Sequence, residues 1–395
     1  MGNNANTPNV RFSGFSEPWL DYTFNDVISV AERPFEMNDY ERYQCVTAKR
    51  RNGGIVSRGF FKGSDILVKS QFKIKAGDYL ISKRQVVHGA NGVVPAVLDD
   101  AIVSNEYLVF QESELLNMEF LAILSKLPSM YEAFFLSSNG VHIEKLLFDF
   151  EDWLTRNVCI PDKDEQKVIV AFFNNIDETI ALKRQQYEQT VSIKKSMLEK
   201  MFPKKGADVP ETRFKGFVEA WKVKSLGEIA FVNMGQSPDS KNYTDNPLDH
   251  ILVQGNADIK NGWVIPRVWT TQVTKTAQKG DIIVSVRAPV GDVGKTNYNA
   301  VIGRGVAAVR GNEFVYQSLL KMKMFDYWGE FSTGSTFDSI TSSQLINTEI
   351  IAPCEKEQAA IGIFFYNLDI LLEAQREELE KLQNIKNACL SKMFV

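Results

Sequence analysis

Apolar residues recur at alternating steps of three and four in two stretches of the chain, 165–202 and 357–394. A repeat of about 3.5 residues sustained over this length is typical of coiled-coil helices, each roughly 55–60 Å long. Pro161 and Pro353 precede the two stretches, and acidic residues follow each proline, as at a helix N-terminus. The seam residues that we expect to pair the helices are Ile176, Ile180, Tyr187, Met197, Met201, Leu368, Leu372, Leu379, Leu382 and Met393.

The regions outside these stretches have a different pattern. Short apolar runs such as 79–82 and 281–286 alternate with turns rich in glycine, asparagine and proline, which is the signature of small α/β or β-rich globules. We therefore predict a globule at 1–157, a helix at 158–204, a second globule at 205–351 and a second helix at 352–395.

The chain is a tandem duplication. Residues 8–19 (PNVRFSGFSEPW) recur at 210–221 (PETRFKGFVEAW), 76–84 are echoed by 279–287, and 161–202 match 353–394 with a shared EQ near the start and KMF at the end. A lone helix of this length with one apolar stripe is poorly stabilised. The two copies are thus expected to pair antiparallel, with a globule at each end of the rod. The alternative is that each helix packs only on its own globule.

Charge is distributed unevenly, although the net charge is only −4. Between Arg42 and Arg84 there are eleven Lys/Arg and two Asp, and between Gly255 and Arg310 eight Lys/Arg and three Asp. Two basic regions on an otherwise acidic chain favour binding of a polyanion at two places. The alternative is that these charges form ordinary solvated faces.

Other features place limits on the class of protein. No apolar run of about 18 residues exists to span a membrane, and the polar start does not resemble a signal peptide. The four scattered cysteines indicate reduced thiols, so a cytoplasmic location is expected. The segment 291–296 (GDVGKT) lacks the first glycine of a phosphate loop, and neither a dinucleotide fingerprint nor metal-ligand spacing around the three histidines is present. We predict a protein that is not an enzyme and binds no metal or cofactor itself.

Several motifs, taken in order, resemble the specificity subunits of type I restriction-modification systems, often called HsdS. They are 233–238 (NMGQSP), 279–285 (KGDIIVS), 334–340 (GSTFDSI) and 353–361, with its proline and EQ pair. The first half departs from the pattern, because it lacks the GQSP-type turn and has NGVHIEK at 139–145. The resemblance implies an α+β fold with two α/β target recognition domains separated by two long antiparallel coiled-coil helices in a pseudo-twofold repeat.

The resemblance also implies a function. Each recognition domain would contact the major groove at one half of a bipartite, asymmetric site in double-stranded DNA. The helices would dock two methyltransferase subunits, and restriction/translocase subunits would join them. S-adenosylmethionine, ATP and Mg would belong to those partners. The alternative function is that of a non-enzymatic, partner-binding coiled-coil protein with duplicated head domains.

Candidate DNA contacts follow from side-chain chemistry. Lys and Arg bind phosphates, whereas Arg and Gln can also make bidentate contacts to guanine and adenine. In the first globule a basic loop and a strand end supply the candidates, and in the second they lie on expected loops. The candidates are Lys49, Arg50, Arg51, Lys83, Arg84, Gln236, Ser237, Arg287, Arg304, Ser335 and Thr336.

Overall fold

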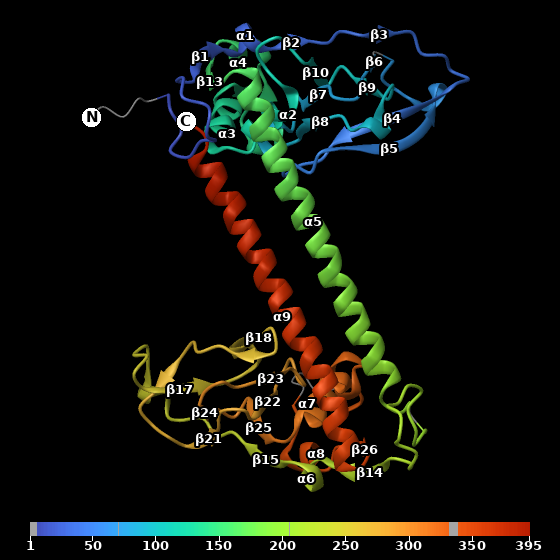
Figure 1. Ribbon diagram of the computed structural model, residues 1–395, viewed down its shortest axis with the longest axis vertical. Coiled ribbons are helices and arrows are strands. Elements are labelled where there is room, and N and C mark those ends of the chain that lie inside the picture. Colours follow the sequence, from blue (N-terminus) through green and yellow to red (C-terminus); the bar gives the residue numbers. More distant parts are fainter. Residues whose placement is uncertain (1–5, 70, 205, 332–338) are drawn as a thin grey trace. The chain divides into compact units, whose positions relative to one another are not determined.

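The computed structural model describes residues 6–69, 71–204, 206–331 and 339–395 (Figure 1). It contains two compact units. Unit 1 consists of residues 1–182 and 379–395, and unit 2 of residues 183–378. The two long helices, α5 (Lys163–Lys200) and α9 (Glu355–Lys392), each contribute one part to each unit.

The remaining helices are short and lie within the globular parts of the units. In unit 1 they are α1 (Phe24–Val27), α2 (Met118–Leu124), α3 (Pro128–Leu136) and α4 (Phe150–Leu154). In unit 2 they are α6 (Leu226–Ile229), α7 (Glu313–Met324) and α8 (Ser342–Ile346). No helix in the described ranges is both long and apolar enough to cross a membrane.

Unit 1 has two main sheets, one of four strands in the order β2-β10-β7-β8 and one of five in the order β3-β6-β9-β4-β5. Two small pairs, β1-β13 and β11-β12, complete it. The strands are β1 (Leu20–Thr23), β2 (Ser29–Val30), β3 (Pro34–Phe35), β4 (Arg42–Ala48), β5 (Ile55–Lys62), β6 (Gln71–Lys73), β7 (Tyr79–Ser82), β8 (Asn91–Val93), β9 (Ile102–Ser104), β10 (Tyr107–Gln111), β11 (Ser138–Asn139), β12 (Leu147–Phe148) and β13 (Asn157–Ile160).

Unit 2 has a six-stranded sheet, β15-β25-β22-β23-β19-β18, a five-stranded sheet, β16-β20-β17-β24-β21, and the pair β14-β26. Its strands are β14 (Lys222–Ser225), β15 (Phe231–Met234), β16 (Tyr243–Thr244), β17 (His250–Val253), β18 (Ile259–Lys260), β19 (Trp263–Val264), β20 (Trp269–Thr270), β21 (Lys275–Ala277), β22 (Ile282–Ser285), β23 (Val293–Lys295), β24 (Ala300–Ile302), β25 (Val306–Arg310) and β26 (Glu349–Ala352).

The two units repeat one topology, as the duplicated sequence predicts. The order β2-β10-β7-β8 in unit 1 corresponds to β15-β25-β22-β23 in unit 2, and β6-β9-β4-β5 corresponds to β21-β24-β17-β20. In each five-stranded sheet one pair is parallel, β4 with β9 and β17 with β24. The units differ at their edges, where β18 and β19 extend the six-stranded sheet of unit 2.

A repeated buried ion pair explains part of the duplicated motif. Arg11 donates from Nε and Nη2 to the carboxylate of Glu165, at 2.7 and 2.6 Å. Arg213 donates in the same way to Glu357, at 2.7 Å for both contacts. Both carboxylate side chains are only 1% exposed. The start of each long helix is thus clamped to the segment that begins its unit.

The KMF sequence at the end of each long helix packs into a core. Phe394 contacts Trp19 edge-to-face at 6.0 Å in unit 1, and Phe202 contacts Trp221 in the same way at 6.0 Å in unit 2. In both units the tryptophan belongs to the duplicated segment, and all four rings are buried. Each core is therefore closed by the end of the long helix that starts in the other unit.

Within each unit the two helix segments run antiparallel. In unit 1, Lys386 of α9 pairs with Asp177 of α5. In unit 2, Lys194 of α5 pairs with Asp369 of α9, and Lys183 of α5 pairs with Glu378 of α9 at 2.8 Å. Residue numbers therefore increase along α5 as those of the paired residues decrease along α9, which is the antiparallel order. The α+β fold with antiparallel long helices and a tandem repeat is confirmed. All ten of the expected seam residues are buried or half-buried.

Candidate nucleic-acid interface

Four of the candidate DNA contacts in unit 2 gather at one end of its six-stranded sheet. Arg287 lies just after β22, Arg304 lies just before β25, and Gln236 and Ser237 follow β15. The register explains the gathering, because Ser285 at the end of β22 and Met234 at the end of β15 lie opposite the start of β25. Segments that are far apart in sequence thus meet where β15 and β22 end and β25 begins. We call this site the edge of unit 2.

Backbone contacts fix the geometry of this edge. The amide of Arg304 donates to Ser237 Oγ at 3.1 Å, and the amide of Gln236 donates to the carbonyl of Ile302 at 2.8 Å. A Cβ on Gly235 would lie 2.1 Å from the carbonyl oxygen of Gly303, so only glycine permits this close approach. The glycine of the GQSP turn therefore positions the polar residues that follow it.

The polar side chains at this edge are available for a ligand. Arg287, Arg304 and Gln236 are exposed, and their side chains have no hydrogen-bond or ion-pair partner among the residues that the structure describes. Arg287 also forms an isolated antiparallel bridge to Ser339. Ser335 and Thr336, which the sequence also suggested, lie outside the described residues.

The equivalent edge of unit 1 carries a different charge. Arg84 follows β7 as Arg287 follows β22, but Arg84 Nε donates to Glu106 at 2.7 Å. Glu106 occupies the position of Gly305, since the amides of Lys83 and Val286 donate to their respective carbonyls, both at 2.9 Å. One residue, glutamate in unit 1 and glycine in unit 2, decides whether the arginine at this edge is paired. Lys83 itself is half-buried, and its amine has no partner in the described part of unit 1.

The basic loop of unit 1 is the tip of the β4–β5 hairpin. Lys49, Arg50 and Arg51 are exposed there, and Arg51 adopts a left-handed φ of 60°. The amide of Arg51 donates to the carbonyl of His88 at 2.7 Å, which holds the tip against the turn that follows β7. Arg50 is engaged twice, by Gln85 Oε1 and by Glu144 Oε2, both at 2.7 Å. Lys49 and Arg51 remain the unpaired cations of this tip within the described residues.

A lysine that was not predicted from the sequence, Lys126, lies beside this tip. Lys126, between α2 and α3, lines a groove of about 490 Å³ together with Arg50, Arg51, His88 and Tyr131. Burial lowers the pKa of Lys126, and the positive charge of Lys386 lowers it further. The charged residues nearest to Lys126 in the sequence are Glu119 and Glu132, so no charge run pointed to it.

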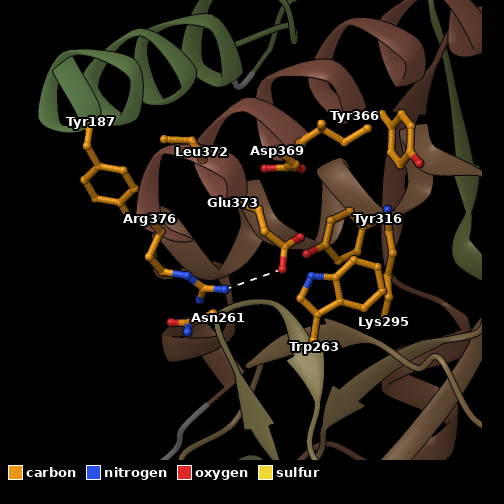
Figure 2. Close-up of a pocket in the computed structure, with 11 residues that line it drawn as sticks. Tyr187, Asn261, Trp263, Lys295, Tyr316, Tyr366, Asp369, Leu372, Glu373 and Arg376 are labelled. Carbon is orange, nitrogen blue, oxygen red and sulfur yellow. Dashed lines mark hydrogen bonds and ion pairs between the residues drawn. The ribbon is translucent and has the colours of Figure 1, made fainter. Parts of the chain in front are cut away.

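A second groove, in unit 2, has balanced charges. Figure 2 shows aromatic rings of Trp263, Tyr316 and Tyr187 around it, and it has a volume of about 340 Å³. Lys295 pairs with Glu313 and lies 4.2 Å from the centre of the Tyr316 ring, while Arg376 pairs with Glu373 at 3.4 Å. Burial raises the pKa of the Tyr316 hydroxyl. With both cations paired, this groove does not suit a polyanion as well as the edge bearing Arg287 does.

Among the described residues, no group of three or more histidine, cysteine, aspartate or glutamate side chains is placed to hold a metal ion. The four cysteines are free thiols. Within the part of the chain that the structure describes, the groups best placed to bind a ligand are therefore the exposed cations and amides next to the ends of strands.

The model of the family described as "type I restriction modification DNA specificity domain" matches the chain twice, at residues 16–191 and 218–384. The two matches fall on the two copies of the repeat and together include most of the chain. This chain belongs to that specificity-domain family. The double match agrees with the two units of one topology.

Individual relatives are described as specificity subunits of type I restriction enzymes. The chain is 31% identical over 247 residues to the MjaX type I restriction enzyme specificity subunit of Methanocaldococcus jannaschii. That match spans 59% of this chain and 57% of the relative. Over 91% of this chain and 96% of the relative, it is 21% identical to the HindI specificity subunit of Haemophilus influenzae.

Solved structures of the family share the fold. The HsdS subunit of Thermoanaerobacter tengcongensis is 25% identical with a TM-score of 0.50, over 97% of this chain and 98% of that one. A chain from a study of complex assembly and conformational transition of a type I restriction-modification system is 26% identical with a TM-score of 0.56, over 95% and 97% of the two chains.

Proposed function

We propose that this chain is the DNA sequence-specificity subunit of a type I restriction-modification complex and recognises a bipartite, asymmetric DNA target, one half-site per unit. The observation that carries the proposal is the polar edge of unit 2, in a chain that belongs to the DNA specificity-domain family. Arg287, Arg304 and Gln236 are exposed and unpaired among the described residues, on backbone held by Gly235 and Ser237. Arginine and glutamine are the side chains that make bidentate contacts to guanine and adenine in the major groove.

The long helices support a second part of the proposal, docking of two methyltransferase subunits. Ile193 on α5 and Ile385 on α9 occupy equivalent positions of the repeat and are 52% and 50% exposed. Two equivalent apolar positions, each in a different unit, suit two copies of one partner. Restriction/translocase subunits join that assembly, and S-adenosylmethionine, ATP and Mg act in the partners.

The alternative function, a partner-binding coiled-coil protein with duplicated heads, is not favoured. Membership of a DNA specificity family accounts for the repeated globules, whereas a purely structural protein gives no reason for unpaired arginines at a sheet edge.

The first prediction separates recognition from catalysis. The purified chain is expected to show no methyl transfer, ATPase or nuclease activity. Addition of a type I methyltransferase subunit and S-adenosylmethionine should produce adenine methylation at a defined sequence, detected by methylation-sensitive sequencing. Methyl transfer by the chain alone, rising in proportion to its concentration, would contradict this division of labour.

The second prediction concerns the unpaired arginines of unit 2. Arg287→Ala or Arg304→Ala should weaken binding to the cognate duplex by about 1–3 kcal/mol for each lost bidentate contact and should relax specificity at one half-site only. Lys279→Ala is the matched control, because it removes a cation just before the start of β22, whereas Arg287 lies just after its end. Binding to duplexes with either half-site scrambled provides the measurement. Equal loss of specificity at both half-sites would disprove the assignment of one half-site to each unit.

A further inference from the structure

The β4–β5 hairpin of unit 1 is more strongly basic than its counterpart in unit 2. Residues 42–62 contain six Lys/Arg and no Asp/Glu. The equivalent 21 residues of unit 2, 250–270, contain two Lys/Arg and one Asp. Arg267 in that segment also lies 3.6 Å from Asp258. Of the two equivalent hairpin segments, only the one in unit 1 is therefore strongly basic.

The hairpin is long, and part of it extends beyond the core. Its strands have seven and eight residues, which corresponds to roughly 25 Å at about 3.4 Å per residue. Val46, Ala48 and Ile55, in the half near the tip, are buried in a hydrophobic cluster. In the other half, Phe60 is 57% exposed. β5 is the last strand of its sheet, so its outer edge is unpaired in the described residues. Figure 1 shows β4 and β5 as the two longest paired arrows of unit 1.

The register places polar and basic side chains on one face of the hairpin, which is exposed at Arg42 and Lys62. Gln44 is half-buried there, and its Nε2 donates to Ser57 Oγ at 3.2 Å. Arg42 lies opposite Lys62, and Gln44 lies opposite Phe60. Because side chains alternate along a strand, these four residues share one face. Arg42 uses one Nη atom to reach the carbonyl of Phe60 at 3.0 Å, which orients the guanidinium and leaves its other donors available. Lys62 lies 5.6 Å from the ring of the exposed Tyr40.

The opposite face of the hairpin is different. Arg58, at the bulge of β5, lines a groove there with Cys45 and Phe61. Burial raises the pKa of the Cys45 thiol, and the nearby charge of Arg58 opposes this rise. Arg58 and Arg42 are therefore two equal charges on the same hairpin that lie on opposite faces of it.

We propose that unit 1 reads its half-site with the half of the β4–β5 hairpin that extends beyond the buried Val46 and Ala48, with Arg42 and Gln44 contacting bases and Lys62 contacting phosphate. A major groove about 12 Å wide admits a two-stranded β-ribbon. At the corresponding edge of unit 1, Arg84 is paired with Glu106, whereas Arg287 in unit 2 is unpaired among the described residues. Conversely, the hairpin segment of unit 2 has little charge. The two units thus present different elements to DNA, which suits an asymmetric target. This inference rests on the proposed function.

The test uses the full chain in complex with its methyltransferase subunits. Methylation-sensitive sequencing first defines both half-sites for the parent complex. Binding of each variant is then measured on the cognate duplex and on duplexes with one half-site scrambled. Arg42→Ala and Gln44→Ala should weaken cognate binding roughly 5- to 150-fold, the range for one lost bidentate contact. They should relax only the half-site that Arg287→Ala leaves unchanged.

Two matched variants distinguish base reading from simple charge. Arg42→Lys keeps the charge but not the fork of donors, so it should lose discrimination while retaining the salt dependence of binding. Arg58→Ala removes the same charge from the opposite face and should leave both half-sites as they were. Thermal unfolding of each variant establishes that unit 1 is still folded.

The inference is overturned if Arg42→Ala and Gln44→Ala leave both half-sites unchanged, if they alter the half-site that Arg287→Ala alters, or if Arg58→Ala has the same effect as Arg42→Ala. If the proposed function is wrong, the parent complex methylates no defined sequence. This result is obtained before any variant is tested, so the two failures are distinguishable.

Discussion

Arg213→Ala is expected to destabilise unit 2 by about 3–5 kcal/mol, because it leaves a buried carboxylate without its partner. The Glu357 side chain is 1% exposed, and both of its oxygens accept from Arg213 at 2.7 Å. Arg213 also donates to the carbonyl of Glu219 at 2.7 Å, so the substitution removes a link within the opening segment of the unit as well. Urea unfolding followed by amide hydrogen exchange in unit 2 measures the loss.

Two comparisons make this prediction specific. Arg11→Ala should have a similar effect on unit 1, since Glu165 is equally buried. Lys204→Ala removes a cation from an exposed pair with Glu211, 69% and 52% exposed, and should cost less than about 1 kcal/mol. A combined Arg213→Met and Glu357→Leu variant should recover much of the stability, because no charge is then left buried. Equal losses for Arg213→Ala and Lys204→Ala would contradict the role assigned to the buried pair.

The fold was predictable because its main signals are local or repeated. The heptad spacing of 165–202 and 357–394 predicted the two long helices, whose observed bounds differ by a few residues at each end. The echo of 76–84 in 279–287 predicted equivalent strands, which are β7 and β22. The buried Arg–Glu clamps were not predicted, although all four residues stood in the quoted motifs. Their partners are 154 and 144 residues apart in sequence, and spacing alone does not pair them.

The candidate site was less predictable, because the state of each arginine depends on a distant residue. Arg84 and Arg287 look alike in the repeated strand motif. What distinguishes them is Glu106 in one unit and Gly305 in the other, brought alongside by the antiparallel pairing of β10 with β7 in unit 1 and of β25 with β22 in unit 2. Arg50 is likewise bound by Glu144, 94 residues away. Composition located the basic regions, but only the register shows which cations are unpaired.

Phe394→Ala is the last prediction, and it tests whether the end of α9 completes the core of unit 1. The Phe394 ring is 9% exposed and lies 6.0 Å from Trp19, Phe120 and Phe173. Removal of a buried aromatic ring from a packed core costs about 3–5 kcal/mol. Amide exchange around Trp19 and α2 should therefore accelerate, while exchange in unit 2 stays unchanged.

Phe202→Ala is the reciprocal variant, because Phe202 packs on Trp221 and Phe314 in unit 2 at 6.0 and 5.3 Å. Amide hydrogen exchange should then accelerate in unit 2 and stay unchanged in unit 1. Val395→Ala changes the neighbouring residue, which is 49% exposed, and should have little effect on either unit. If Phe394→Ala behaved like Val395→Ala, the end of α9 would not be part of the core of unit 1. If it instead loosened both units equally, the two cores would not be independently closed by the two KMF sequences.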